Sequence, residues 1–217
     1  MVNLLIKELK IGVNPFFYVL PFLTGALMLI PGWLYFLVIL YFCFLTIPNM
    51  FGGYKSQNDL MFTTMLPVTK TDIVKAKIAF LVILELLHLV IAILYGMVTV
   101  RLYPDMIYYF FSPTFGFWGL NFVMLAIFNL IFIPMYYKTA YKYGAASVAS
   151  ITAAMLFAGG AEWISIQNPH LHDLFKGAGA DNLAVQLLLF LAGIVIFALF
   201  TLIAYYMANK RFKKVEM

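Results

Sequence analysis

Charged side chains are scarce in this sequence: Asp, Glu, Lys and Arg make up only 11% of its 217 residues, whereas 65% are hydrophobic. A soluble domain usually carries roughly 25% charged residues. A single small core cannot hide so much apolar surface from water, which excludes a water-soluble fold. We therefore expect an all-α membrane protein, in which residues 1–217 form one membrane domain without a second, soluble domain.

Cysteine and catalytic motifs are also nearly absent. Cys43 is the only cysteine and lies in an apolar run, which excludes an intramolecular disulfide. The stretch Gly52–Ser56 superficially resembles a phosphate-binding loop, but Tyr54 separates its glycines from Lys55. Serine motifs of the GxSxG type and the zinc motif HExxH are missing. We therefore expect no catalytic residue, no metal site and no cofactor bound by this chain.

Apolar runs long enough to cross roughly 30 Å of hydrocarbon recur six times. Pro31 and Gly32 allow only a tight turn between the first two runs, and Pro21 can kink the first. The sequence therefore predicts six transmembrane helices, at approximately Pro15–Ile30, Trp33–Phe51, Ile78–Val100, Phe115–Tyr136, Gly144–Ile164 and Leu183–Ala208.

The basic residues indicate the orientation of these helices. With the N-terminus inside, twelve of the 14 Lys and Arg residues fall in inner segments, and only Arg101 and Lys176 fall outside. The positive-inside rule then places both termini in the cytoplasm, and the loops Arg101–Thr114 and Ser165–Asn182 outside. Because the basic residues cluster at helix ends, the net charge of +5 indicates the bilayer as a partner rather than nucleic acid.

The first twelve residues predict a short amphipathic helix at the membrane surface rather than a cleavable signal peptide. Asn3, Lys7 and Lys10 share one helical face, opposite an apolar face made of Val2, Leu5, Ile6 and Leu9. A signal peptide would carry its charges first and end in small residues.

Four polar side chains interrupt the apolar runs. Glu85 and His88 share a face of the third predicted helix, and Asn121 and Asn129 lie on the fourth. An ionisable group in hydrocarbon is costly, so Glu85 and His88 should face protein or water. The four residues can line a transport pathway or hold helices together by hydrogen bonds. An intramembrane enzyme using Glu85 and His88 is a further alternative, although a di-metal site would need a second E-x-x-H motif.

The longest inner loop, residues 54–77, is unusually apolar for a cytoplasmic segment. Ser56 or Asn58 can cap a short helix in it, and Pro67 would end that helix. The pattern Thr69–Asp72 is typical of a capping box that starts a second helix, which would run directly into the membrane. The loop is interpreted either as a docking helix across the base of the bundle or as an ordinary interfacial segment.

The segment LPVTKTDIVKAK, Leu66–Lys77, resembles the membrane subunits of type 2 ABC exporters, in particular the small six-helix bacterial permeases without a fused ATPase. That family usually has an acidic residue earlier in the loop, where this sequence has Gln57–Asp59. The small size and short outer loops are most similar to permeases that export peptides such as phenol-soluble modulins. The residues that match the family pattern are Leu66, Pro67, Val68, Thr69, Lys70, Ile73, Val74 and Lys77.

This resemblance implies a multi-pass permease of the bacterial cytoplasmic membrane that exports amphipathic peptides or other apolar cargo and is not itself an enzyme. It implies a coupling helix near Asn58–Leu66 that docks on a separate ATPase carrying ATP and Mg, and a second permease, identical or homologous. Drug exporters, immunity permeases and a non-catalytic immunity factor are alternatives. The implied ATPase-coupling residues are Asp59, Leu60, Phe62, Met65, Leu66, Pro67 and Lys70. The polar residues within the expected helices are then the candidates for the cargo pathway: Glu85, His88, Asn121 and Asn129.

Overall fold

Helices make up most of the chain, as its apolar runs require in a solvent that cannot satisfy backbone groups. The computed structural model describes residues 2–12, 14–106, 108–139, 142–176 and 182–215, and none of these residues is in a strand. The shorter helices are α1 (Val2–Lys7), η1 (Glu8–Gly12), α2 (Phe16–Gly25), η2 (Ala26–Leu29), α3 (Phe36–Tyr41), η3 (Phe42–Thr46), α4 (Ile47–Ser56), α5 (Asp59–Thr64) and α9 (Pro169–Lys176). The longer ones are α6 (Lys70–Leu102), α7 (Phe115–Thr139), α8 (Gly144–Gln167) and α10 (Leu183–Lys213).

Five helices in the described part are long and apolar enough to cross a membrane: Phe36–Ser56, which joins α3, η3 and α4, together with α6, α7, α8 and α10. The expected all-α membrane fold is therefore confirmed. The first expected segment forms a helix that is shorter than these five. It covers only Phe16–Leu29 and spans roughly 20 Å at about 1.5 Å per residue. This helix continues through Pro21 and tightens to a 3₁₀ turn at η2. The predicted outer loop Ser165–Asn182 includes residues 177–181, which lie outside the described residues.

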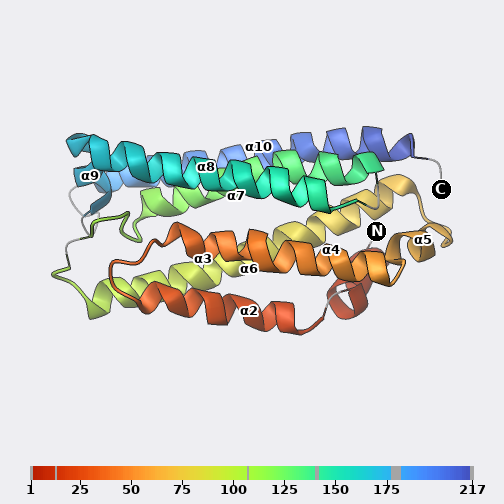
Figure 1. Cartoon of the computed structure of the whole chain (residues 1–217), viewed down its shortest axis with the longest axis horizontal. Helices are drawn as coiled ribbons and strands as arrows, with labels where there is room; N and C mark the ends of the chain where they lie inside the picture. The colour runs from red at the N-terminus through yellow and green to blue at the C-terminus, as the bar shows by residue number, and fades with distance from the viewer. Residues whose placement is uncertain (1, 13, 107, 140–141, 177–181, 216–217) are drawn as a thin grey trace.

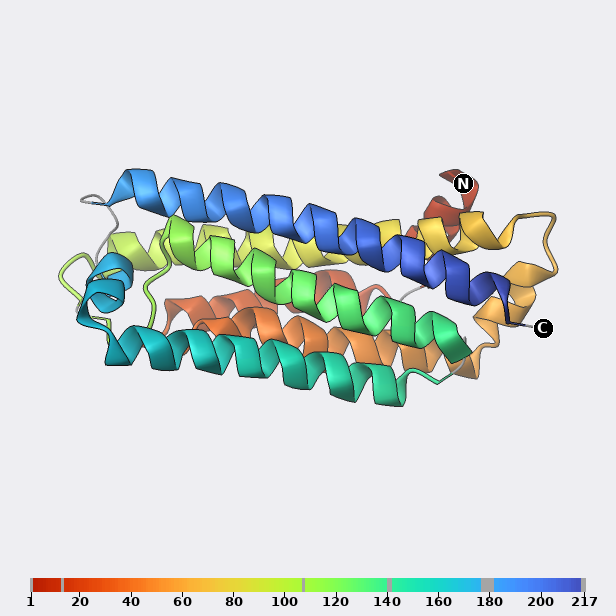
Figure 2. The ribbon, with the colours of Figure 1, turned by 90° about the horizontal axis from the view of Figure 1, so that it is seen from above.

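The helices lie side by side in an elongated bundle (Figures 1 and 2). The start of α1, the end of α10 and the short helix α5 lie at one end, whereas α9 lies at the opposite end. α10 packs mainly on α7 and also on α6, α7 packs on α8, and α2 packs on α6. The α5 end is called the basal end below.

The N-terminal helix combines contact with the bundle and an exposed apolar surface. α1 buries Leu4, and it exposes Val2 and Ile6, which were expected on its apolar face. α1 packs against α6, and Glu8, the first residue after α1, is buried in the protein, so Val2 and Ile6 remain exposed on the side away from these contacts. The amphipathic pattern alone did not reveal that a carboxylate on this segment is buried.

Aromatic rings fix the second membrane helix against α7. Phe128, Phe132 and Tyr136 recur every four residues on α7, and their rings stack with centroid distances of 5.3 and 6.1 Å. Phe51 of α4 meets Phe132 and Tyr136 edge-on, at 4.8 and 4.6 Å. Edge-to-face aromatic pairs of this kind add to the packing that buried area supplies.

α7 and α10 approach each other closely at two facing glycines. A Cβ atom added to Gly193 would lie 2.2 Å from the carbonyl oxygen of Gly119, and one added to Gly119 would lie 2.4 Å from that of Leu189. Small residues at such a crossing let backbones touch and maximise van der Waals contact, which drives helix association in lipid. Only glycine fits at both positions without moving one helix.

Gly193→Ala should therefore destabilise the bundle by about 1–3 kcal/mol, because the methyl group forces α10 away from α7. Gly159→Ala on α8 is the matched control, since nothing lies within 4 Å of its added Cβ. There the substitution should be neutral or stabilise the helix by up to about 1 kcal/mol. Thermal unfolding of the two purified variants in detergent measures the difference, and equal midpoints would show that the close crossing does not limit stability.

Candidate functional site

A left-handed residue separates α5 from the second membrane helix at the basal end. Asn58 has φ 52° and ψ 32°, so the chain turns sharply between Ser56 and Asp59. An N-cap residue normally has extended backbone, and neither expected cap forms: the Asn58 side chain makes no cap hydrogen bond, and the Ser56 hydroxyl donates to the carbonyl of Gly53 at 2.9 Å. The cap expected from Ser56 or Asn58 is therefore wrong, although a short helix does follow.

The start of α6 follows its sequence signal closely. Thr69 has extended backbone, and its hydroxyl accepts from the Asp72 amide at 3.1 Å and donates to the Asp72 carboxylate at 2.7 Å. This reciprocal pair fixes the first turn, so the helix runs uninterrupted from Lys70 to Leu102. Pro67 is exposed in the short connection between α5 and α6.

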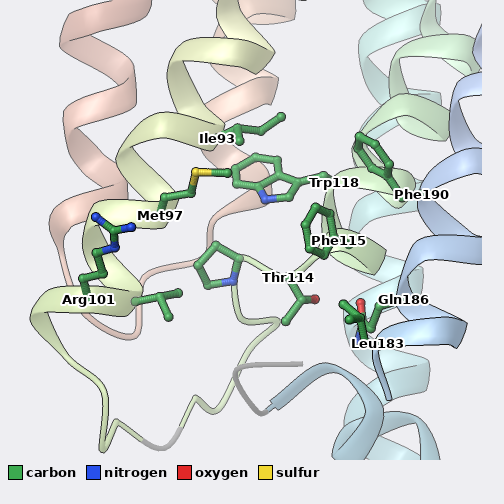
Figure 3. Close-up of a pocket in the computed structure, with 11 residues that line it drawn as sticks. Ile93, Met97, Arg101, Thr114, Phe115, Trp118, Leu183, Gln186 and Phe190 are labelled. Carbon is green, nitrogen blue, oxygen red and sulfur yellow. The ribbon is translucent and has the colours of Figure 1, made fainter. Parts of the chain in front are cut away.

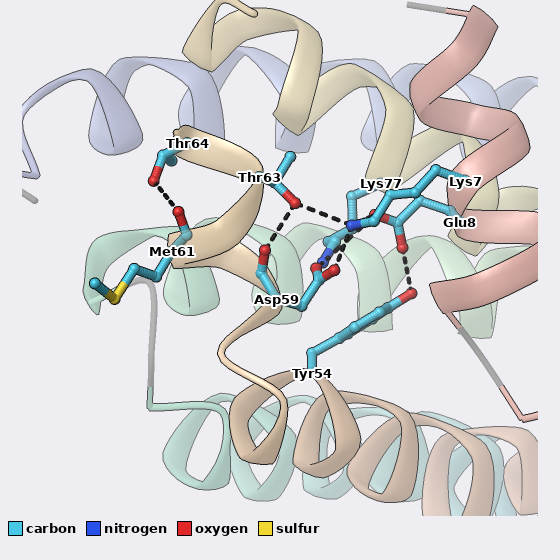
Figure 4. Close-up of polar contacts among 8 residues, drawn as sticks. All are labelled: Lys7, Glu8, Tyr54, Asp59, Met61, Thr63, Thr64 and Lys77. Atoms are coloured by element: carbon cyan, nitrogen blue, oxygen red, sulfur yellow. Dashed lines mark hydrogen bonds and ion pairs between the residues drawn. The ribbon is translucent and has the colours of Figure 1, made fainter. Parts of the chain in front are cut away.

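Asp59, the first residue of α5, is the centre of a buried ionic cluster (Figure 4). Its carboxylate accepts from Lys77 of α6 at 2.7 Å and from Lys7 of α1. Lys7 also lies 3.3 Å from Glu8 and donates to the Thr63 hydroxyl at 2.9 Å. Two acids and two lysines thus neutralise each other, which meets the requirement that buried charges be paired.

Tyr54 closes the cluster from the side of α4. Its hydroxyl donates to Glu8 at 2.6 Å, and its ring lies 3.5 Å from the ammonium group of Lys77. Glu8 and Lys77 are themselves 3.8 Å apart, and both are almost fully buried. The cluster therefore joins the N-terminal segments α1 and η1 to the later segments α4, α5 and α6.

The charged neighbours also control the titration of Asp59. Burial alone would raise the pKa of its carboxyl group, but the ammonium groups of Lys77 and Lys7 outweigh burial, so the pKa lies below its usual range. A carboxyl group whose pKa is lowered by folding stabilises the folded chain when it is ionised. This contribution is complete above the unfolded pKa of about 4 and is lost as the pH falls through the folded value.

α5 has two distinct faces. Asp59, Leu60 and Thr63 point into the protein, in accordance with helical periodicity. The opposite face and the residues just after it expose apolar side chains, with exposed fractions of 51% for Met61, 60% for Phe62, 70% for Met65 and 38% for Leu66. We call these four residues the basal apolar face. Asp59 and Leu60 are buried inside this chain, so they do not belong to it, and Met61 joins it.

Lys70 connects the start of α6 with the end of α10. Its ammonium group donates to the carbonyl of Val215 at 2.7 Å and lies 5.7 Å from the ring centre of Phe212. Thr71 adds a hydrogen bond to Asn209 at 3.1 Å. Lys70 therefore holds two helices of this chain together at the basal end, beside the connection that follows α5.

Polar residues in the middle of the bundle form a second group. Glu85 is fully buried, and its carboxylate accepts from the Asn129 amide at 2.9 Å, which also lies 3.3 Å from the Thr201 hydroxyl. This contact links α6, α7 and α10. His88 instead contacts its own helix, with Nδ1 2.9 Å from the carbonyl of Leu84, and Asn121 donates to Phe117 at 2.9 Å.

Each residue of this group keeps one polar atom without a partner among the described residues: Oε1 of Glu85, Nε2 of His88 and the Oδ1 atoms of Asn121 and Asn129. The structure brings Glu85 and Asn129 together, whereas His88 and Asn121 bond within their own helices. No group of three or more His, Cys, Asp or Glu residues suited to a metal ion occurs in the described ranges.

Asp59→Asn should lower the free energy of unfolding by about 3 kcal/mol, because it leaves the buried Lys77 and the partly buried Lys7 facing one carboxylate. Adding Lys77→Met removes a charge of the other sign and should restore part of the loss. Asp105→Asn, at an exposed acid in a turn after α6, is the control and should change little. Thermal unfolding in detergent measures all three, and equal effects of Asp59→Asn and Asp105→Asn would contradict a stabilising cluster.

The comparisons with known proteins agree with this architecture. Residues 3–213 match the model of a family described as ABC-2 family transporter protein. Neither a comparison with curated proteins nor one with solved structures gave a match. The family implies an ABC transporter with an ATPase partner, in which this multi-pass membrane chain is a transport subunit rather than a catalytic one. Because the match covers nearly the whole sequence, the chain belongs to the ABC-2 family of transporter membrane proteins.

Proposed function

We propose that the chain is the permease subunit of an ATP-driven exporter that moves amphipathic peptides or other apolar cargo out of the cytoplasm. α5 is its coupling helix, and the basal apolar face is the surface that binds a separate ATPase subunit. The observation that carries the proposal is the exposure of four apolar side chains at the basal end: Met61, Phe62, Met65 and Leu66. The inward face of the same helix is fixed by the ion pair between Asp59 and Lys77. ATP and Mg are expected on the ATPase.

A short apolar helix suits a groove on a soluble partner. Recognition of a helix in a groove uses large apolar anchors at helical spacing, and Phe62 of α5 is three residues from Met65, which directly follows α5. Flexible methionine side chains adapt to such a groove. An ordinary interfacial segment would instead bury these side chains in lipid, and only a partner-binding experiment distinguishes the two.

The proposed permease has six membrane crossings, the five long helices and the shorter helix Phe16–Leu29. An odd number of crossings would leave the two ends of the chain on opposite sides of the membrane. The start of α1 and the end of α10 lie at the same end of the bundle, which supports counting Phe16–Leu29 as a crossing. The excess of Lys and Arg in the expected inner segments favours a cytoplasmic location for the basal end.

A second permease completes the proposed transporter. α8 and α10 are the least buried of the five long helices, so they carry broad apolar surfaces that a partner permease or lipid covers. The cargo pathway is proposed to include Glu85, His88, Asn121 and Asn129. Their unpartnered polar atoms support this role, because a change in the packing of α6 and α7 would offer these atoms to cargo or water.

Replacing Phe62 and Met65 together by Asp should detach the ATPase and stop transport. A central apolar anchor at an interface costs about 2 kcal/mol or more when it is lost, which is roughly a 30-fold loss of affinity. Gln57→Asp is the matched control, because it adds a negative charge at an exposed position just before α5 that is not part of the basal apolar face. Co-purification of the ATPase and its activity are measured for each variant. If co-purification and ATPase activity are unchanged in the double variant, α5 does not bind the ATPase and is an interfacial segment.

The orientation is tested by labelling single cysteines in a Cys43→Ala background. Gln57→Cys lies beside α5 and His170→Cys on α9, at opposite ends of the bundle and both exposed. An impermeant thiol reagent added to intact cells should label position 170 and leave position 57 unlabelled until the membrane is opened. Labelling of position 57 from outside would reverse the proposed orientation.

A further inference from the structure

A cavity lies at the end of the bundle opposite α5, between α6, α7 and α10 (Figure 3). Its volume is about 490 Å³, within the range of pockets that hold small ligands. Apolar side chains dominate its lining, among them Ile93 and Met97 of α6, Trp118 of α7 and Phe190 of α10. The cavity therefore favours an apolar chain over a polar solute.

One cation stands at the edge of this apolar lining. Arg101, in the last turn of α6, is exposed and makes no hydrogen bond or ion pair with the described residues. Figure 3 shows its side chain at one side of the cavity, with Trp118 and Phe115 across from it. Arg101 and Lys176 are the only basic residues in the expected outer segments. An arginine that pairs with no acid in the described part of the chain and stands at an apolar cavity favours a ligand with an anionic head and an apolar tail.

The position of the cavity identifies where such a ligand comes from. α6 ends at Leu102 and α10 begins at Leu183, so the cavity lies close to the ends of two membrane helices. The neighbouring surface of α6 exposes Leu94, Val98 and Leu102, which are apolar and suited to acyl chains. An arginine near a helix end extends its guanidinium group to the level of the lipid headgroups. The cavity thus borders the bilayer rather than the aqueous phase.

We propose that this cavity binds an anionic phospholipid from the outer leaflet, with an acyl chain against Met97, Trp118 and Phe190 and the phosphate against Arg101. The negative charge of the whole headgroup provides the selectivity, because a zwitterionic lipid places its own cation beside the phosphate. One arginine at the membrane surface corresponds to a roughly fivefold preference for the anionic lipid. The site is independent of ATPase docking.

The fluorescence of Trp118 reports on this site directly. The protein has three tryptophans, so Trp33→Phe and Trp163→Phe leave Trp118 as the only emitter. The protein is reconstituted into phosphatidylcholine bilayers with a minor fraction of either phosphatidylglycerol or phosphatidylcholine carrying brominated acyl chains. Brominated phosphatidylglycerol should quench Trp118 at about one fifth of the concentration that brominated phosphatidylcholine needs.

Substitution of Arg101 separates selective binding from mere contact with the bilayer. Arg101→Gln should abolish the preference, Arg101→Lys should keep part of it, and Lys55→Gln, the same charge change at an exposed position of the basal end, should leave it intact. Elution as a single peak and an unchanged emission maximum show that the variants are folded. Equal quenching by both lipids, or a preference that survives Arg101→Gln, would overturn the proposal.

A synthetic amphipathic peptide with a free C-terminal carboxylate tests whether the cavity binds peptide instead of lipid. If the two brominated lipids quench equally while the peptide changes Trp118 emission only when Arg101 is present, the cavity binds peptide and the lipid proposal is wrong. Failure of this experiment leaves ATPase docking untouched, because no measurement in it uses the ATPase.

Discussion

The ion pair between Asp59 and Lys77 is the interaction on which the basal end depends. It joins the first residue of α5 to the eighth residue of α6, while Lys7 holds the same carboxylate from α1. Breaking a buried pair by removing one partner costs about 3–5 kcal/mol, more than most single contacts in a protein. A six-residue helix is not stable alone. The short helix α5 therefore depends on these ion pairs with its neighbours.

The two faces of α5 therefore differ in what they contact. The inward face fixes the helix to α6, and the outward face leaves large apolar side chains free for a partner. In the proposed coupling, a push on the outward face would pass through the ion pair to α6, a helix of 33 residues that reaches the contact between Glu85 and Asn129. Lys70 ties the same end of α6 to the end of α10, so the two helices are held together beside α5. These contacts form a continuous physical connection from the basal apolar face to the polar group in the membrane.

The sequence predicted the elements of this arrangement better than their contacts. Apolar runs located the membrane helices, and the Thr69–Asp72 pattern located the start of α6, because both signals are local. The apolar run around Phe62 indicated a helix after Asn58, but its short length could not show which side chains turn inward. Asp59 and Leu60 are among the coupling residues that the resemblance implies, and the structure buries both inside this chain.

The partners of Asp59 could not be predicted, because they come from two other segments, α1 and α6. Lys7 and Glu8 belong to a pattern that favours a surface helix, and Lys77 is one of many basic residues at the end of a membrane helix. A lysine within the first turns of an apolar helix and an isolated acid in an inner loop were the available signals. Their pairing follows only from the tertiary packing that brings α5 and α1 to the start of α6.

Spin-label distances test the rigid connection between α5 and α6 most directly. Labels at Thr64→Cys on α5 and Lys75→Cys on α6, in a Cys43→Ala background, report on the connection, and labels at Val98→Cys on α6 and Leu156→Cys on α8 report on the bundle. The distances are measured by pulsed electron paramagnetic resonance in the complex with the ATPase, before and after a non-hydrolysable ATP analogue is added. The account predicts an unchanged distance from residue 64 to residue 75 and a changed distance from residue 98 to residue 156. A change between residues 64 and 75, with none between residues 98 and 156, would show that α5 moves alone and would contradict it.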